Sequence, residues 1–142
     1  MAEAFSLQLA DGLEWRIDPP VDPHGDGYVR TACVRIRARG LEAGTVATFS
    51  DGTSDLARFF AELAADWRGW DGERIWTALE NEMEVKASHD GARVMVAVTV
   101  RRPDLSYADD AWEAKIVFRL EPGEQLTNVA RDLASTFAWQ PR

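Results

Sequence analysis

The sequence predicts an α+β fold: a single antiparallel sheet of about seven strands with two amphipathic helices on one face. Strand-like segments alternate apolar and polar residues, which is typical of a sheet with one covered and one solvated face. Two further segments repeat large apolar residues at helical spacing. The expected order is ββββαβββα in one globular domain, residues 1–142, because 142 residues with 46% hydrophobic content suffice for one continuous core.

The first part of the chain predicts a hairpin and a later strand. Residues 5–9 and 13–17 alternate apolar and polar side chains around Asp11-Gly12, a dipeptide typical of tight hairpin turns. A segment rich in Pro and Gly follows and is expected to be a loop. Residues 41–49 predict a further strand, although a glycine weakens the pattern.

Residues 28–39 predict a strand with one apolar face and one largely cationic face, which bears Arg35, Arg37 and Arg39. Cys33 lies in this strand and is the only cysteine, so no intrachain disulfide is expected. Its position in the strand suggests a small buried apolar residue in a reducing compartment.

Two segments predict amphipathic helices. Thr53 or Ser54 is expected to cap the first helix, and Gly69 to end it. Its apolar stripe consists of Leu56, Phe59, Phe60, Leu63 and Trp67. The second helix repeats this spacing with Leu126, Val129, Ala130, Leu133 and Phe137. Several strands precede each helix, so the architecture repeats, although residue identity between the halves is slight.

Between the helices, the period of the apolar residues changes from 3.6 to 2. One parity is apolar and is interrupted near Asn81, where a bulge is expected: Ile75, Thr77, Leu79, Met83, Val85 and Ala87. Asp90-Gly91 then predicts a hairpin turn into a strand rich in valine, residues 94–100. Residues 112–120 alternate again and predict the last strand.

The composition favours a basic partner over nucleic acid. The net charge is -8, whereas a protein that binds duplex nucleic acid needs a cationic surface. The first residues do not resemble a secretion signal, and no apolar run approaches the roughly 20 residues of a membrane span. We therefore expect a cytoplasmic protein with no membrane association.

Catalytic and metal sites are disfavoured. His89 and Asp90 could form an acid/base pair, but neighbouring side chains on a strand point to opposite faces, and an Asp in a turn usually bonds its own backbone. His24, His89 and Cys33 lack the spacing of metal ligands. We expect no catalytic residues, no metal and no cofactor.

The candidate partner-binding residues cluster between the helices. They are Trp70, Asp71, Glu73, Trp76, Glu80, Glu82 and Glu84. Trp is enriched at binding hot spots, and a row of glutamates on the solvated face would attract a basic protein. Simpler interpretations are that the Trp side chains pack in the core and that the glutamates pair across the sheet with the arginine row of residues 35–39.

The central stretch resembles a known family. The segments FFAELAADWRGWDGERIWTALE, HDG, VMVAVTVRR and LEPGEQL are similar to small bacterial proteins, of actinobacterial type, that form a domain family of unknown function. They also resemble immunity proteins of wall-associated polymorphic toxins. The most specific part is Trp67-x-Gly69-Trp70-x-Gly72. The resemblance implies a cytoplasmic protein that binds and neutralises a cognate toxin without catalysis.

We therefore expect a non-enzymatic protein-binding domain, such as an immunity protein that neutralises a basic toxin. The alternative is a small-ligand-binding or structural domain that uses a Trp-lined side of the sheet. A homodimer through the uncovered sheet face or an edge strand is left open, since Met95, Ala97 and Val117 add apolar surface there.

Overall fold

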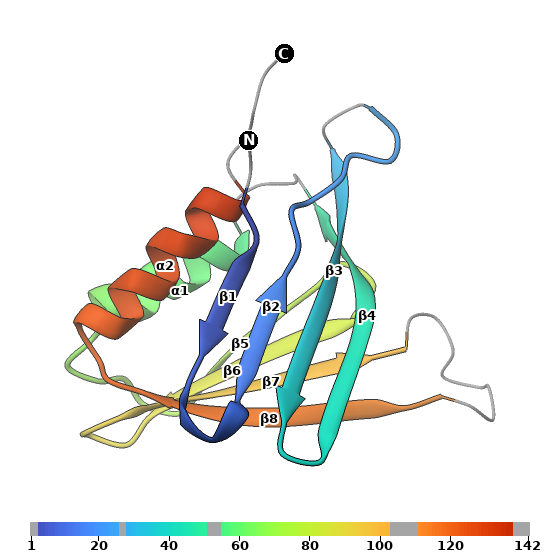
Figure 1. Ribbon diagram of the computed structural model, residues 1–142. Helices are drawn as coiled ribbons and strands as arrows, with labels where there is room; N and C mark the ends of the chain where they lie inside the picture. Colours follow the sequence, from blue (N-terminus) through green and yellow to red (C-terminus); the bar gives the residue numbers. More distant parts are fainter. Residues whose placement is uncertain (1–2, 26–27, 51–54, 103–110, 138–142) are drawn as a thin grey trace.

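The described residues form eight strands and two α-helices, in the order ββββαββββα. The computed structural model describes residues 3–25, 28–50, 55–102 and 111–137. The α+β class is confirmed, but the predictions of about seven strands and of a single sheet are wrong. The strands form two separate four-stranded sheets, whose strands cross at a steep angle in Figure 1.

The first sheet is antiparallel and follows chain order, β1-β2-β3-β4. Its strands are β1 (Phe5–Gln8), β2 (Glu14–Ile17), β3 (Val29–Ala38) and β4 (Leu41–Ser50). The first hairpin is confirmed: β1 pairs with β2, and a short 3-10 turn, η1 (Ala10–Gly12), joins them. Helix α1 (Asp55–Ala65) then begins the connection to the second sheet. The expected capping residues, Thr53 and Ser54, lie outside the described residues.

The second half repeats the path of the first. Its antiparallel sheet again follows chain order, β5-β6-β7-β8, and again a helix follows the fourth strand. The elements are β5 (Glu73–Thr77), β6 (Met83–His89), β7 (Val94–Arg101), β8 (Glu113–Leu120) and α2 (Glu124–Thr136). Neither described helix combines the length and the apolar character that crossing a membrane requires.

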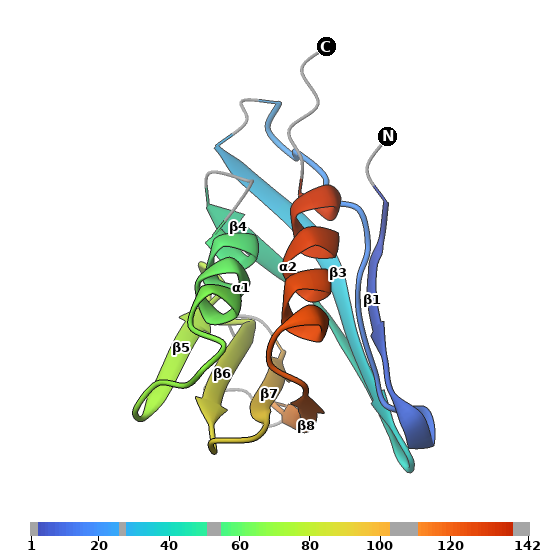
Figure 2. The ribbon, with the colours of Figure 1, turned by 90° about the vertical axis from the view of Figure 1, so that its left-hand side faces the viewer.

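One core is shared by both sheets and both helices. Trp15 of β2 is fully buried, and its ring lies 5.1 Å from that of Phe5, 5.9 Å from that of Phe60 and 6.5 Å from that of Phe118, measured between centroids. These neighbours come from the first sheet, α1 and the second sheet. In Figure 2 the helices lie side by side across the open side of the wedge formed by the two sheets.

The segment predicted as one bulged strand is two strands, because a turn separates β5 from β6. Asn81 takes a left-handed conformation with φ of 64°, and the N–H of Ala78 donates to the carbonyl of Met83 at 2.8 Å. The turn inverts the expected phase of β5, whose inner face bears Trp76. Ile75 is 54% exposed instead of buried.

Each sheet has an inner face in the core and an outer face in solvent. The alternation in β6 and β7 correctly predicted this for Val85 and Val96, which are buried. Cys33, by contrast, is exposed on the outer face of the first sheet, where it pairs in register with Val46, so the prediction of a buried cysteine is wrong. Its neighbours of opposite parity in β3, Ala32 and Val34, fill the core instead.

Candidate partner-binding site

The loop between α1 and β5 presents the tryptophan motif. Helix α1 ends at Ala65, so Trp67 lies beyond the helix instead of on its buried stripe, and it is 47% exposed. Gly69 has φ of 136°, a conformation that side chains disfavour, and its N–H donates to the carbonyl of Asp66 at 2.9 Å. The reversal at Gly69 directs the chain back toward the β6–β7 hairpin.

His89 holds this loop against the hairpin. Its Nδ1 accepts the N–H of Gly91 at 2.9 Å, so the ring proton belongs on Nε2, which donates to the carbonyl of Trp67 at 2.9 Å. Both ring nitrogens are therefore used by the backbone. The ring also lies edge-on to Trp70, with centroids 5.3 Å apart. This geometry gives His89 a structural role.

Trp70 is held on three sides. Besides its contact with His89, its indole N–H donates to the carbonyl of Ala87 at 3.4 Å. The Arg74 guanidinium lies 4.8 Å from the ring centroid and pairs with the Asp66 carboxylate at 2.8 Å. The Trp70 side chain is therefore held between the β6–β7 hairpin and Arg74 of β5.

Trp76 serves both the core and a surface groove. Its ring stacks on Phe49 of β4, with centroids 5.7 Å apart. It also lines a groove of about 400 Å³ beside α1, together with Arg58, Phe59 and Glu62. Core packing, the simpler interpretation, and the lining of a groove therefore both hold for this residue.

The expected row of glutamates does not form. Glu82 is 2% exposed and accepts hydrogen bonds from the Thr48 hydroxyl at 2.6 Å and from the N–H of Glu80 at 3.1 Å. Glu84 lies at the outer face and pairs with Arg101 at 3.6 Å and Lys86 at 3.7 Å. Of the three glutamates, only Glu80 is left exposed.

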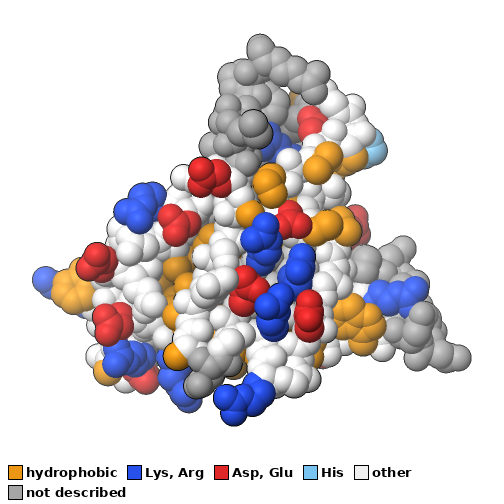
Figure 3. All heavy atoms as spheres, viewed as in Figure 1, with side chains coloured by type: hydrophobic (Ala, Val, Ile, Leu, Met, Phe, Trp, Pro, Cys, Tyr) orange, Lys and Arg blue, Asp and Glu red, His pale blue; other side chains and the backbone are white. Residues whose placement is uncertain are grey.

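The arginine row of β3 lies on the other sheet, so the expected pairing with those glutamates is wrong. Arg37 instead lies 3.8 Å from the Glu14 carboxylate and 4.0 Å from that of Glu42, on neighbouring strands of its own sheet. Arg16 pairs with Asp18 at 2.8 Å. Figure 3 shows cationic and acidic side chains interspersed over the face of the molecule on which this sheet lies in Figure 1.

Asp71 and Glu73 do remain close to Trp70 and Trp76, as predicted. Both are exposed, as is Glu62 across the groove, and none of the three forms an ion pair with another described residue. Four of the seven predicted residues therefore stay in one stretch of loop and strand, to which the structure adds Trp67, although Glu73 lies on the outer face of β5 and Trp76 on its inner face. In the sequence, Trp67 continues the helical spacing of the buried stripe. It is exposed because α1 ends at Ala65, before Trp67 is reached.

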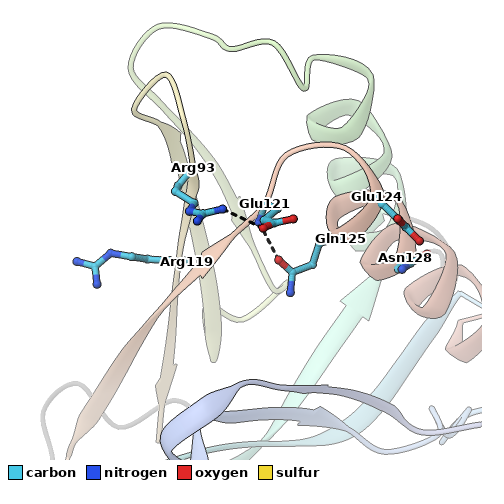
Figure 4. A pocket seen from close by; sticks show the side chains of 6 residues that line it. All are labelled: Arg93, Arg119, Glu121, Glu124, Gln125 and Asn128. Atoms are coloured by element: carbon cyan, nitrogen blue, oxygen red, sulfur yellow. Dashed lines mark hydrogen bonds and ion pairs between the residues drawn. The ribbon is translucent and has the colours of Figure 1, made fainter.

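A second hollow was not predicted from the sequence. It is a polar depression of about 500 Å³ at the start of α2 (Figure 4), lined by Arg93, Arg119, Glu121, Glu124, Gln125 and Asn128. Arg93 pairs with the Glu121 carboxylate at 3.2 Å. The backbone N–H of Glu121 donates to the side-chain oxygen of Gln125 at 2.7 Å. No group of three metal-ligating side chains occurs in the part of the chain that the structure describes.

Asp90 supports the hairpin that carries His89. Its carboxylate accepts the N–H groups of Arg93 at 2.7 Å and Ala92 at 2.8 Å, and these bonds lower the pKa of the carboxyl below its ordinary value. The charged Asp90 carboxylate therefore stabilises the folded protein at pH values above the pKa that this group has in the unfolded chain, about 3.9. This stabilisation is lost as the pH falls through the lower pKa that Asp90 has in the folded protein.

We expect Asp90→Asn to be less stable than the wild type at neutral pH, and the difference to shrink as the pH falls below about 4, since the charged form no longer contributes there. Urea denaturation of both proteins between pH 3 and 7 measures this difference. Other carboxyl groups titrate equally in both and cancel. A difference that is constant over this range would contradict the assignment.

Comparison with known families places the chain in one of them. A model described as a family of unknown function, DUF6228, matches residues 14–140. The chain belongs to this family. The DUF6228 match extends from β2 through α2 and so includes the tryptophan loop, the second sheet and the first sheet without β1. Comparisons with curated proteins and with solved structures find no match.

Proposed function

We propose that this DUF6228 domain is a non-enzymatic protein-binding domain, an immunity protein that neutralises a basic toxin in the cytoplasm. The observation that carries this proposal is the rigid tryptophan loop. Trp67 is 47% exposed, yet its backbone is fixed by His89, and Trp70 beside it is fixed by Ala87 and Arg74. Interface hot spots are enriched in Trp and Arg.

Rigidity and charge both favour binding at this loop. A side chain that is already ordered loses less conformational entropy when a partner docks, which lowers the cost of association. The exposed carboxylates of Asp71, Glu73 and Glu62 give the surroundings of the loop a negative charge. Such a surface accelerates encounter with a basic protein and competes with the phosphates that a nuclease toxin would bind.

Trp67→Ala is expected to raise the Kd for the toxin about 30-fold or more, which corresponds to a hot-spot loss of about 2 kcal/mol. The binding partner for this test is the purified protein encoded beside the domain, and calorimetry gives the Kd. The matched control is Trp112→Ala, because Trp112 is 39% exposed at the start of β8. We expect this control to leave the Kd unchanged.

A cell-growth assay completes this test. Coexpression of the domain is expected to protect cells from the toxin, and the Trp67→Ala variant is expected to protect less than Trp112→Ala. If the wild-type domain neither binds the neighbouring protein nor protects cells from it, the immunity function is wrong. Equal loss of binding in the two variants would instead exclude the tryptophan loop as the site.

The groove beside Trp76 favours a second function, binding of a small apolar ligand. Its volume of about 400 Å³ falls within the range of ligand pockets. Two aromatic side chains, Trp76 and Phe59, line it, as is common in such pockets. A thermal-shift screen with apolar dyes and metabolites tests this function. Stabilisation that Trp76→Ala abolishes would favour it, and a screen with no stabilising compound would count against it.

A further inference from the structure

Strand β5 is an edge of the second sheet, and half of its backbone groups point outward. In an antiparallel pair, alternate residues direct their N–H and C=O groups to the same neighbour. The N–H of Ala78 bonds the carbonyl of Met83, so in the same register Trp76 and Arg74 also bond β6. The backbone groups of Ile75 and Thr77 then face away from the sheet.

These outward groups of Ile75 and Thr77 form no backbone hydrogen bond with any other described residue. An unpaired strand edge of this kind is a template for another strand. The edge at β4 differs, because the carbonyl of Thr48 there accepts the N–H of Leu79 from the β5–β6 turn at 2.8 Å. That contact occupies part of the β4 edge, and because Leu79 continues the parity of Ile75 and Thr77, it also ends the free part of the β5 edge at Thr77.

The other edge of the same sheet, β8, is protected by charge. Lys115 and Arg119 flank Val117 on its exposed outer face, and lysine on an edge strand discourages pairing with another chain. Strand β5 has no lysine. The centre of its outer face is Ile75, which is 54% exposed.

The groove beside α1 lies where an added strand would place its inward side chains. Successive side chains of a strand point to opposite faces, so a segment paired with β5 would direct every second residue toward Trp76 and Phe59. Its other residues would lie beside Ile75 on the outer face. Backbone pairing combined with a side-chain pocket is the pattern of strand-addition binding sites.

Charge identifies the chemistry of the incoming segment. Four exposed carboxylates lie in β5, in the connections on either side of it, or on helix α1. None of them forms an ion pair with another described residue. They are Glu62, Asp71, Glu73 and Glu80. Arg58 also lines the groove, but these carboxylates outnumber it. An extended segment that alternates basic and apolar residues complements both the charge and the groove.

We propose that the free edge of β5 binds an extended segment of the partner protein, with alternating basic and apolar residues, as an added fifth strand. This inference rests on the proposed protein-binding function and specifies its binding mode. The apolar residues of the segment enter the groove at Trp76 and Phe59. The basic residues lie on the outer face, beside Ile75 and the exposed carboxylate of Glu73, with Asp71 and Glu80 in the connections at either end of the strand.

The probe for this proposal is a capped nonapeptide of alternating lysine and valine, added to the 15N-labelled full-length protein. We expect chemical-shift changes and slowed hydrogen exchange at the Ile75 and Thr77 amides. A peptide with glutamate in place of lysine is expected to bind at least tenfold more weakly. The same loss is expected for a lysine–valine peptide with N-methylated backbone amides, which lacks hydrogen-bond donors but leaves the protein unchanged.

Two proline variants form a matched pair. Ile75→Pro removes an outward N–H of β5 and is expected to weaken peptide binding at least tenfold. Val117→Pro does the same on β8, where the N–H of Arg102 bonds the carbonyl of Trp112 and the register leaves Val117 outward. We expect this control to leave peptide binding unchanged. Circular dichroism verifies that each variant is folded.

Several results would overturn the proposal. The first is the absence of chemical-shift changes at β5. The second is that the glutamate peptide or the N-methylated peptide binds as tightly as the lysine–valine peptide. The third is a concentration-dependent shift at β5 without peptide, which would make a second copy of the chain the occupant. If the toxin binds Ile75→Pro normally but not Trp67→Ala, the edge proposal fails and the immunity function stands. If the peptide binds at β5 but the domain binds no toxin, the strand-addition site stands and the immunity function fails.

Discussion

Replacing Trp15 by alanine is expected to lower the free energy of unfolding by about 3–5 kcal/mol. The indole is fully buried, and its contacts with Phe5, Phe60 and Phe118 join the first sheet, α1 and the second sheet. The alanine variant leaves a cavity at the point where these three layers meet. Because small domains have only about 5–15 kcal/mol of stability, this loss is a large fraction of the total.

Urea denaturation followed by fluorescence and by circular dichroism measures this loss. Trp112→Ala is the control, since Trp112 is 39% exposed, and we expect it to cost clearly less stability than Trp15→Ala. If Trp15 joins both halves, the wild type unfolds in one transition by both probes. Two separate transitions, or a loss for Trp15→Ala as small as that of the control, would contradict a shared core.

Replacing Thr48 by valine is expected to cost about 1–3 kcal/mol, because it removes the hydroxyl that donates to the buried Glu82 carboxylate at 2.6 Å. The carboxylate would then keep only the N–H of Glu80 among the hydrogen bonds described. This contact also links the two sheets, since Thr48 lies in β4 and Glu82 lies in the turn that precedes β6. Chemical denaturation measures the cost.

Thr45→Val is the matched control in the same strand, because the buried Thr45 hydroxyl has no partner among the described residues. We expect its effect to be close to zero or slightly stabilising. A double-mutant cycle of Thr48→Val with Glu82→Leu is expected to give a coupling of about 0.5–3 kcal/mol, since the loss at Thr48 depends on the carboxylate. Equal effects of Thr48→Val and Thr45→Val would exclude the link.

The sequence was sufficient for local structure and insufficient for the arrangement of the sheets. Alternation correctly predicted that β6 and β7 have one covered face, on which Val85 and Val96 lie. Asp90-Gly91 correctly predicted the second hairpin. However, alternation does not show whether a helix or another sheet covers that face. The phase of β5 was also inaccessible, because the turn at Asn81 changes the parity that links Ile75 to Met83.

The candidate site was predicted in part for the same reason. Trp70, Asp71, Glu73 and Trp76 lie in one loop and the following strand, so proximity in the sequence kept them together. Glu82 and Glu84 depend on long-range contacts: one is buried against Thr48, and the other pairs with Arg101. Such contacts require the packing of the two sheets, which a residue pattern does not contain.

Hydrogen exchange of the complex with the neighbouring toxin tests the central claim most directly, because it locates the contact surface without any substitution. The predicted result is slowed exchange from Trp67 through Thr77, with no change in the amides of β2 and β3. Slowed exchange confined to β2 and β3, around Arg16, Arg35 and Arg37, would contradict the assignment of the tryptophan loop and β5 as the binding site.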